Sequence, residues 1–182
     1  LRKSLEKKFK KPFEKIAKEL IFKPLKMKDT DFVWSRKTDE SRFAIGYNEI
    51  GEPYKTIKNT KANAADDLYT TIEDYGNFLV DILDGGNLSE KIYQEMLKKQ
   101  SKIKENQYFG LGWVLYDLGN SEFAISHSGA DNGTQCLVVL LPNTKQGVII
   151  FTNSDNGNKI YEKILTNYLG DYGRKIIKIE NK

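Results

Sequence analysis

Two apolar segments joined by a short glycine-containing bend constrain the fold of this chain more than any other feature. Phe123 to Ser126 and Gln135 to Leu141 both show the apolar or alternating pattern of β-strands. Between them lies Asp131-Asn132-Gly133, whose residue types favour a tight turn. Strands joined by so short a loop must be antiparallel. The sequence therefore predicts a hairpin, with a polar segment at the edge of a sheet.

The rest of the pattern predicts helices before and after a group of strands. The predicted strands are at about 110–117, 122–128, 134–141 and 146–152. The predicted helices are at about 1–20, 71–84, 89–99 and 157–168, with residues 26–68 mostly irregular and residues 173–182 disordered or paired as an edge strand. We expect one domain of α+β class, an antiparallel sheet covered by helices. Its helical and irregular part is residues 1–107, and residues 108–182 hold the strands and a C-terminal helix.

Composition narrows the class of protein. The chain has 182 residues, of which 39% are hydrophobic and 12% aromatic, enough for a core. No apolar run is long enough to span a membrane. Cys136 is the single cysteine, so it can form no disulfide within the chain, and its place in an apolar strand predicts a packing role.

Charge gives a weaker indication. The net charge is +4, and the run Lys7-Lys8-Phe9-Lys10-Lys11 is of a kind that binds nucleic acid or an anionic membrane surface. Glu6 and Glu14 flank it, however, and beyond Phe9 and Phe13 it has no interleaved aromatic residues of the kind that stack on bases. A solvated helix face is therefore the favoured interpretation, and no nucleic-acid partner is expected.

The polar segment of the hairpin contains the candidate site, His127-Ser128-Gly129. His127 is the only histidine of the chain. Histidine and serine side chains offer hydrogen bonds, and the glycine lets a ligand approach the backbone closely. By themselves these residues favour the simpler interpretation, a hairpin whose histidine is exposed or merely hydrogen-bonded.

An ordered series of motifs surrounds this triplet. In sequence order it consists of Phe109-Gly110-Leu111-Gly112-Trp113, His127-Ser128-Gly129, Asp131-Asn132-Gly133, the apolar run from Cys136 to Leu141, Pro142-Asn143, the apolar run from Gly147 to Phe151, and Thr152-Asn153. The series resembles the C-terminal part of the serine β-lactamase and penicillin-binding-protein-like superfamily, in particular its class C-related branch. A series in fixed order is more specific than any one triplet.

Upstream segments extend the resemblance to about residues 1–169. Residues 21–30 look like the family's "IF-x-PLGM-x-DT" segment, with Lys26 where glycine is usual. Residues 44–47 look like "A-x-GY", and residues 64–74 like "AA-G-G-L-x-ST-x-x-D". Asp66 and Asp67 replace small residues there, so we expect altered turn geometry near that helix.

The resemblance implies a C-terminal fragment with an incomplete β-lactamase/transpeptidase-like fold. Catalytic members acylate a serine of a Ser-x-x-Lys motif, faced by a Tyr-x-Asn loop, and both motifs lie upstream of "IF-x-PLGM". We therefore expect nucleophile and base before Leu1, with no catalytic residue in the fragment, which alone would be inactive.

Two local matches to these catalytic motifs are unsuitable for catalysis. Ser4-Leu5-Glu6-Lys7 matches Ser-x-x-Lys, but in a helix Lys7 points about 160° away from Phe9, toward other lysines and solvent. A lysine base must be partly desolvated to lower its pKa. Tyr75-Gly76-Asn77 matches Tyr-x-Asn, but residues two apart in a helix diverge by about 200°. Neither match is expected to form a site.

The resemblance also assigns binding roles and a function. His127, Ser128 and Gly129 would line the substrate cleft, and the Ala130 N–H would contribute to an oxyanion hole. Lysine is usual in the triplet of β-lactamases and peptidases, whereas histidine is more common in esterases and aminopeptidase-like enzymes, which puts β-lactam resistance in doubt. A neutral histidine also attracts a substrate carboxylate less than a lysine.

Three functions remain open at this point. The first is the substrate-cleft part of a β-lactamase-related serine acyl hydrolase of peptidase, esterase or β-lactamase type, acting on a small-molecule or peptide acyl substrate without cofactor or metal. The second is a binding or regulatory pseudoenzyme on the same fold, and the third an unrelated anion- or nucleic-acid-binding module. The resemblance implies an extracytoplasmic parent protein, and a sheet face left bare in a fragment predicts self-association.

Overall fold

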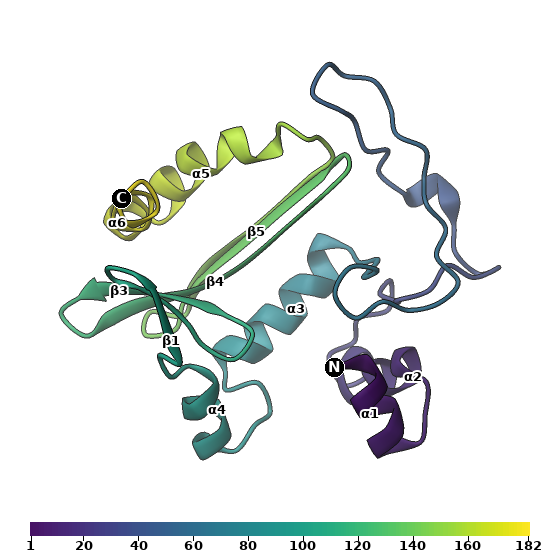
Figure 1. The fold of residues 1–182 in the computed structure, drawn as a ribbon, viewed down its shortest axis with the longest axis horizontal. Coiled ribbons are helices and arrows are strands. Elements are labelled where there is room, and N and C mark those ends of the chain that lie inside the picture. Colours follow the sequence, from purple (N-terminus) through teal and green to yellow (C-terminus); the bar gives the residue numbers. More distant parts are fainter. The chain divides into compact units, whose positions relative to one another are not determined.

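A computed structural model describes residues 1–182, the whole of the given sequence. The chain divides into two compact units (Figure 1). The first unit contains Leu1–Ala44 and Lys55–Ile82, and the second contains Ile45–Tyr54 and Leu83–Lys182.

The first unit begins with helical segments, of which the first two are separated by a bend and the third continues directly from the second. They are α1 (Arg2–Phe9), α2 (Phe13–Ala17) and a π-helical turn, η1 (Lys18–Phe22). The prediction of one helix over residues 1–20 is therefore wrong. Lys10 takes a left-handed conformation with φ 51° and ends α1, and Pro12 lies just before the first residue of α2. Proline has no N–H to continue the preceding helix, but its fixed φ suits a helix start.

A small core and the buried carboxylate of Asp74 help to hold this unit together. The core contains Ala17, Phe22 and Met27. Asp74, in α3 (Ile72–Leu83), is buried, and its Oδ2 accepts hydrogen bonds from the Asp29 N–H at 2.7 Å and the Thr30 hydroxyl at 2.8 Å. These bonds fasten the segment before the long irregular stretch to the helix after it. The unit also contains a short 3-10 turn, η2 (Glu40–Arg42).

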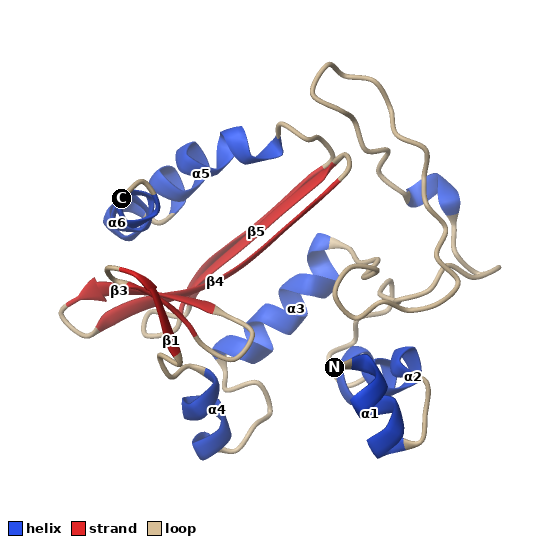
Figure 2. Ribbon diagram, in the orientation of Figure 1, coloured by secondary structure: helices blue, strands red, loops and turns tan.

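The second unit is built on one antiparallel sheet of six strands in sequential order (Figure 2). The strands are β1 (Ser101–Lys104), β2 (Gln107–Phe109), β3 (Val114–Gly119), β4 (Glu122–Asp131), β5 (Thr134–Leu141) and β6 (Gln146–Thr152). The bounds of β5 and β6 confirm the predicted 134–141 and 146–152. The predicted strand over 110–117 starts too early, because residues 110–113 form a turn in which the Gly110 N–H donates to the Trp113 carbonyl at 2.8 Å.

Helices cover one face of this sheet and bury its main core. α4 (Glu90–Met96) precedes the sheet; η3 (Gly157–Ile160), α5 (Tyr161–Tyr168) and α6 (Gly170–Glu180) follow it. In Figure 1, α5 runs alongside β5, and α6 lies at the C-terminal end of α5. The core between helices and sheet contains Tyr116, Leu118, Ala124, Val139, Leu141, Leu165, Leu169, Ile176 and Ile179.

The C-terminal residues form a helix, which corrects the prediction of a disordered tail or edge strand over 173–182. Ile176 and Ile179 lie one turn apart in α6 and are both buried in the core. A spacing of three residues fits one face of a helix. The prediction instead followed the weak two-residue alternation at Ile176, Ile177 and Ile179.

Candidate functional site

The second half of β4 has one free edge, because no other strand pairs with it on that side. β3 pairs with β4 only as far as the partners Val114 and Ser126, whereas β5 pairs with β4 to its end at Asp131. Burial changes at the same point, since Ala124–Ser126 are buried and residues 127–131 are exposed. We call residues 127–131 the open edge of β4. It contains all four predicted binding residues, His127, Ser128, Gly129 and Ala130.

Alternation along β4 decides which backbone groups face outward. The strand turns into β5 through two residues, with Asp131 opposite Thr134, and Gly129 lies opposite Cys136. The N–H of Gly129 points toward the Cys136 thiol and donates a hydrogen bond to it. Burial raises the pKa of this thiol, and the hydrogen bond lowers it by a smaller amount. Successive N–H groups of a strand point to opposite sides. The N–H groups of Ser128 and Ala130 therefore point away from β5, to the open edge.

The side chains of the open edge belong to two different faces of the sheet. Ala124 is part of the core under α5 and α6, so Ser128 and Ala130 lie on the same face as this core. His127 lies on the opposite face, where its ring meets the Trp113 ring edge-on at 6.4 Å between centroids. Trp113 belongs to the Phe109–Trp113 motif, but nothing in the sequence indicates that its ring contacts the histidine.

The tip of the hairpin is fastened by a segment from far upstream. Gly46 and Gly133 touch through their backbones, and a Cβ placed on Gly133 would lie 2.7 Å from Gly46 Cα. Asp155 Oδ1 accepts from the Gly133 N–H at 2.6 Å, and its Oδ2 accepts from the Tyr54 hydroxyl at 2.9 Å. The hydrogen bond to Asp155 also raises the pKa of the Tyr54 phenol. Asp155 thus fixes the turn that ends the open edge, a role that sequence reasoning did not find.

Motifs that are far apart in the sequence meet at this point. The Tyr47 N–H donates to the Asn153 carbonyl at 3.0 Å, and the Asn153 side chain donates to the Ile45 carbonyl at 2.9 Å. Residues 45–47 therefore lie against the end of β6, where the Thr152-Asn153 motif is. This arrangement joins the "A-x-GY", "Thr-Asn" and hairpin-turn segments into one support for the open edge.

Comparison with known proteins identifies the family. The family model described as Beta-lactamase matches residues 1–169. The chain belongs to the β-lactamase family. A curated β-lactamase of Yersinia enterocolitica is 25% identical over 183 residues, a match that covers 81% of this chain and 47% of that protein. The chain thus spans about half the length of the curated relative it matches.

Solved structures of this family share the fold. A penicillin-binding protein homologue from Pyrococcus abyssi, described as octameric, matches 93% of this chain and 40% of its own, with a TM-score of 0.75 and 22% identity. A D-amino acid amidase from Ochrobactrum anthropi, complexed with D-phenylalanine, matches 91% of this chain and 58% of its own, with a TM-score of 0.72 and 26% identity. The antiparallel sheet with its helices is therefore a partial penicillin-binding-protein-like fold, as expected.

The positions at which this chain departs from the family pattern have different structural consequences. Lys26, where glycine is usual, takes a left-handed conformation with φ 58°. Asp66 and Asp67 do not take positive φ. Asp67 is buried instead, and its carboxylate accepts from the Asn59 side chain at 2.5 Å and from the Asn63 N–H at 2.7 Å. Strain at positive φ is therefore confined to Lys26 among these three positions.

The two local matches to catalytic motifs have the surroundings expected from helix geometry. Ser4 and Lys7 are both exposed on α1. Tyr75 and Asn77 lie within α3, the first half-buried and the second exposed. Lys7 therefore lacks the desolvated surroundings that a catalytic lysine base requires.

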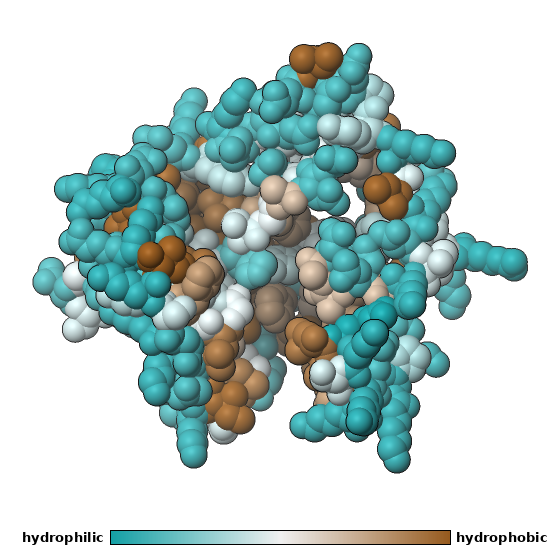
Figure 3. Space-filling view, viewed as in Figure 1, coloured by the Kyte–Doolittle hydropathy of each residue, from teal (hydrophilic) through white to brown (hydrophobic).

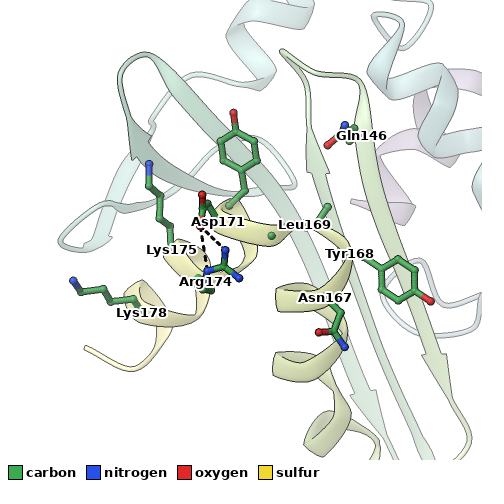
Figure 4. A pocket seen from close by; sticks show the side chains of 10 residues that line it. Gln146, Asn167, Tyr168, Leu169, Asp171, Arg174, Lys175 and Lys178 are labelled. Atoms are coloured by element: carbon green, nitrogen blue, oxygen red, sulfur yellow. Dashed lines mark hydrogen bonds and ion pairs between the residues drawn. The ribbon is translucent and has the colours of Figure 1, made fainter.

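Other features of the second unit provide no comparable site. A hollow of about 770 Å³ lies beside α5 and α6 (Figure 4). Arg174 and Asp171 in its wall pair with each other, and Lys175 donates to the Leu118 carbonyl at 2.8 Å. No group of three or more histidine, cysteine, aspartate or glutamate side chains is placed to hold a metal ion. No helix is long and apolar enough to cross a membrane.

Proposed function

We propose that this chain is the substrate-binding part of a β-lactamase-related serine acyl hydrolase, and that the nucleophile lies in a part of the protein outside residues 1–182. The open edge of β4 carries this proposal, because it presents backbone N–H groups, a hydroxyl and an imidazole on one exposed strand. An extended acyl substrate would add to such an edge through main-chain hydrogen bonds.

Each group at the open edge has a definite part in this reaction. A serine elsewhere in the protein attacks the acyl carbonyl, and the Ala130 N–H donates to the oxygen that becomes negative. Ser128 donates to a polar group of the substrate. Gly129 has no side chain, so the substrate can approach the backbone closely at this position. A Cβ there would also lie 3.0 Å from Cys136 Sγ, which is too close for a larger residue unless the thiol moves.

The histidine of the triplet favours amides or esters over β-lactams as substrates. β-Lactams carry a carboxylate, which the ammonium group of a lysine at this position attracts more strongly than an imidazole does. The similarity to a D-amino acid amidase agrees with an amide substrate. The family resemblance further leads us to propose an extracytoplasmic location for the whole protein.

The test is hydrolysis by the whole protein of a panel of D-amino acid amides, short-chain esters and a chromogenic β-lactam. Ala130→Pro removes the N–H at the open edge, where proline is tolerated because no strand pairs there. We expect kcat to fall about 100-fold or more, as on loss of an oxyanion donor. Ala130→Gly keeps the N–H and should retain most activity. Equal activity of the two variants, both folded by circular dichroism, would rule out this role for Ala130.

A pseudoenzyme that binds acyl compounds without cleaving them is the second candidate. The presence of histidine in the triplet and of Asp66-Asp67 upstream favours it slightly. A binding protein would retain ligands at the open edge but would form no covalent adduct with an acylating probe. His127→Lys separates the two further, because in an enzyme it should shift turnover toward carboxylate-bearing substrates.

A further inference from the structure

Positive charge is concentrated at the start of the chain. Residues 1–28 contain 11 of the 29 basic residues but three of the 25 acidic ones. This segment therefore has a net charge of +8, whereas the remaining residues together have −4. The charge asymmetry lies within the first unit and involves neither β4 nor its open edge.

The charges of this segment are exposed and mostly unpaired. All ten of its lysines are exposed. Lys11 pairs with Glu19 at 2.6 Å and Lys18 approaches Asp31 at 3.7 Å, while the other eight lysines make no ion pair. In Figure 3 the surface over α1 and α2 is mostly hydrophilic, with long side chains projecting outward. Unpaired lysines close together repel one another, and an anionic partner removes this repulsion.

Exposed apolar side chains lie among these lysines. Leu20 is 58% exposed and Ile21 38% exposed in the π-helical turn, between Lys18 and Lys23. Phe9 is 41% exposed at the end of α1, between Lys8 and Lys10. Of the three apolar residues in the π-helical turn, only Phe22 is buried in the core of the unit, whereas Leu20 and Ile21 are exposed to solvent. Lysines next to exposed aliphatic and aromatic side chains are typical of helices that lie on membranes.

We propose that residues 1–28 bind the surface of a bilayer of anionic phospholipids. Lysines near such a surface are attracted to its negative potential, and clusters of four to eight of them indicate anionic-lipid binding. Leu20, Ile21 and Phe9 then enter the boundary between headgroups and acyl chains, where burial of their apolar surface is favourable. Nucleic acid fits less well, because aliphatic side chains do not stack on bases.

Flotation of the whole protein with lipid vesicles tests this proposal. At low salt, vesicles of phosphatidylglycerol mixed with phosphatidylcholine should bind it and vesicles of phosphatidylcholine alone should not. Added salt should weaken the binding, because it screens charges at a surface. Replacing Lys3, Lys7 and Lys8 together by glutamine should lower the affinity at least about tenfold.

Matched controls separate this segment from net charge alone. Replacing Lys91, Lys102 and Lys159, three exposed lysines of the second unit, by glutamine removes the same charge and should leave vesicle affinity within about twofold. Leu20→Ser with Ile21→Ser should weaken binding to vesicles without changing the net charge. Equal loss in both lysine variants, or tighter binding to duplex DNA than to anionic vesicles, would overturn the proposal. Hydrolysis of soluble substrates does not depend on this outcome.

Discussion

Lys26 has a backbone conformation that suits glycine better than any residue with a side chain. Its φ is 58°, and it follows the π-helical turn, with the Lys26 N–H donating to the Lys23 carbonyl at 3.1 Å. A side chain in the left-handed region is disfavoured, and glycine is common just after a helix for this reason.

Lys26→Gly should therefore stabilise the protein by about 0.5–1 kcal/mol. Lys28→Gly is the matched control, because Lys28 is equally exposed but does not have positive φ, so glycine there should be neutral or destabilising. Denaturant unfolding of both variants gives the comparison. If Lys26→Gly is no more stable than Lys28→Gly, the left-handed conformation at residue 26 is wrong.

Asp155 is the residue on which the end of the open edge depends most. Asp155→Ala removes the acceptor of both the Gly133 N–H and the Tyr54 hydroxyl, and should cost about 1–3 kcal/mol. Amide hydrogen exchange at Gly133 should accelerate, and the pKa of Tyr54 should fall toward its ordinary value. Asp131→Ala, which removes only an acceptor for the neighbouring Asn132 N–H, should change neither measurement at these residues. Unchanged exchange at Gly133 in Asp155→Ala would contradict the role of Asp155.

At the scale of elements, a partly buried polar contact fixes the end of α6 to the sheet. The Tyr116 hydroxyl donates to the Glu180 carboxylate, which also accepts from the Gln107 side chain at 2.7 Å. Burial, and next the hydrogen bond to Glu180, raise the pKa of Tyr116 well above its usual value. Burial also raises the pKa of Tyr161 in α5 to about 12. The folded state thus favours the protonated form of both phenols.

This preference makes the free energy of unfolding depend on pH in the alkaline range. Stabilisation that comes from a raised tyrosine pKa is complete below the unfolded value of about 10 and is lost as the pH rises above it. The free energy of unfolding should therefore fall between about pH 10 and pH 12. Tyr116→Phe should cost about 1–3 kcal/mol at pH 7 and make the alkaline fall shallower. Tyr168→Phe, at an exposed position of α5, should change neither value, and an alkaline fall as steep in Tyr116→Phe as in the parent would refute the explanation.

The elements that sequence patterns predicted are those whose own residues determine them. β5 and β6 are continuous apolar runs bounded by turn residues, and both bounds were predicted. β1 and β2 were missed because they are short, and β1 in particular is mostly polar, so it depends on its neighbours for pairing. α6 was missed because its few apolar residues do not form a clear helical pattern in the sequence, and their burial depends on the sheet face against which they pack.

The candidate site was predictable in part. The triplet and Ala130 were located from the order of motifs, and they lie together on one exposed strand. β3 begins only at Val114 and so leaves the edge of β4 open beyond Ser126, because residues 110–113 form a turn that the apolar pattern of that segment concealed. The contribution of Asp155 depends on contacts between segments about 100 residues apart, which no local pattern contains.

At the scale of the whole molecule, the chain combines one sheet with an open edge and a separate, strongly basic helical segment. The first is proposed to bind an acyl substrate and the second an anionic membrane surface. The chain spans about half the length of the curated relative it matches. Our proposal is that the nucleophile lies in the other half of the β-lactamase-like fold. Self-association through a bare sheet face is a further proposal, which sedimentation of this chain alone would test.

Mass-spectrometric mapping of the residue acylated in the whole protein tests the central claim most directly. The protein would be treated with an activated ester or β-lactam probe, digested and sequenced. The account predicts one labelled serine outside residues 1–182, followed three residues later by a lysine, with labelling slowed by Ala130→Pro and not by Ala130→Gly. A label on Ser4 or Ser128, or no label in a protein that binds the probe, would contradict it.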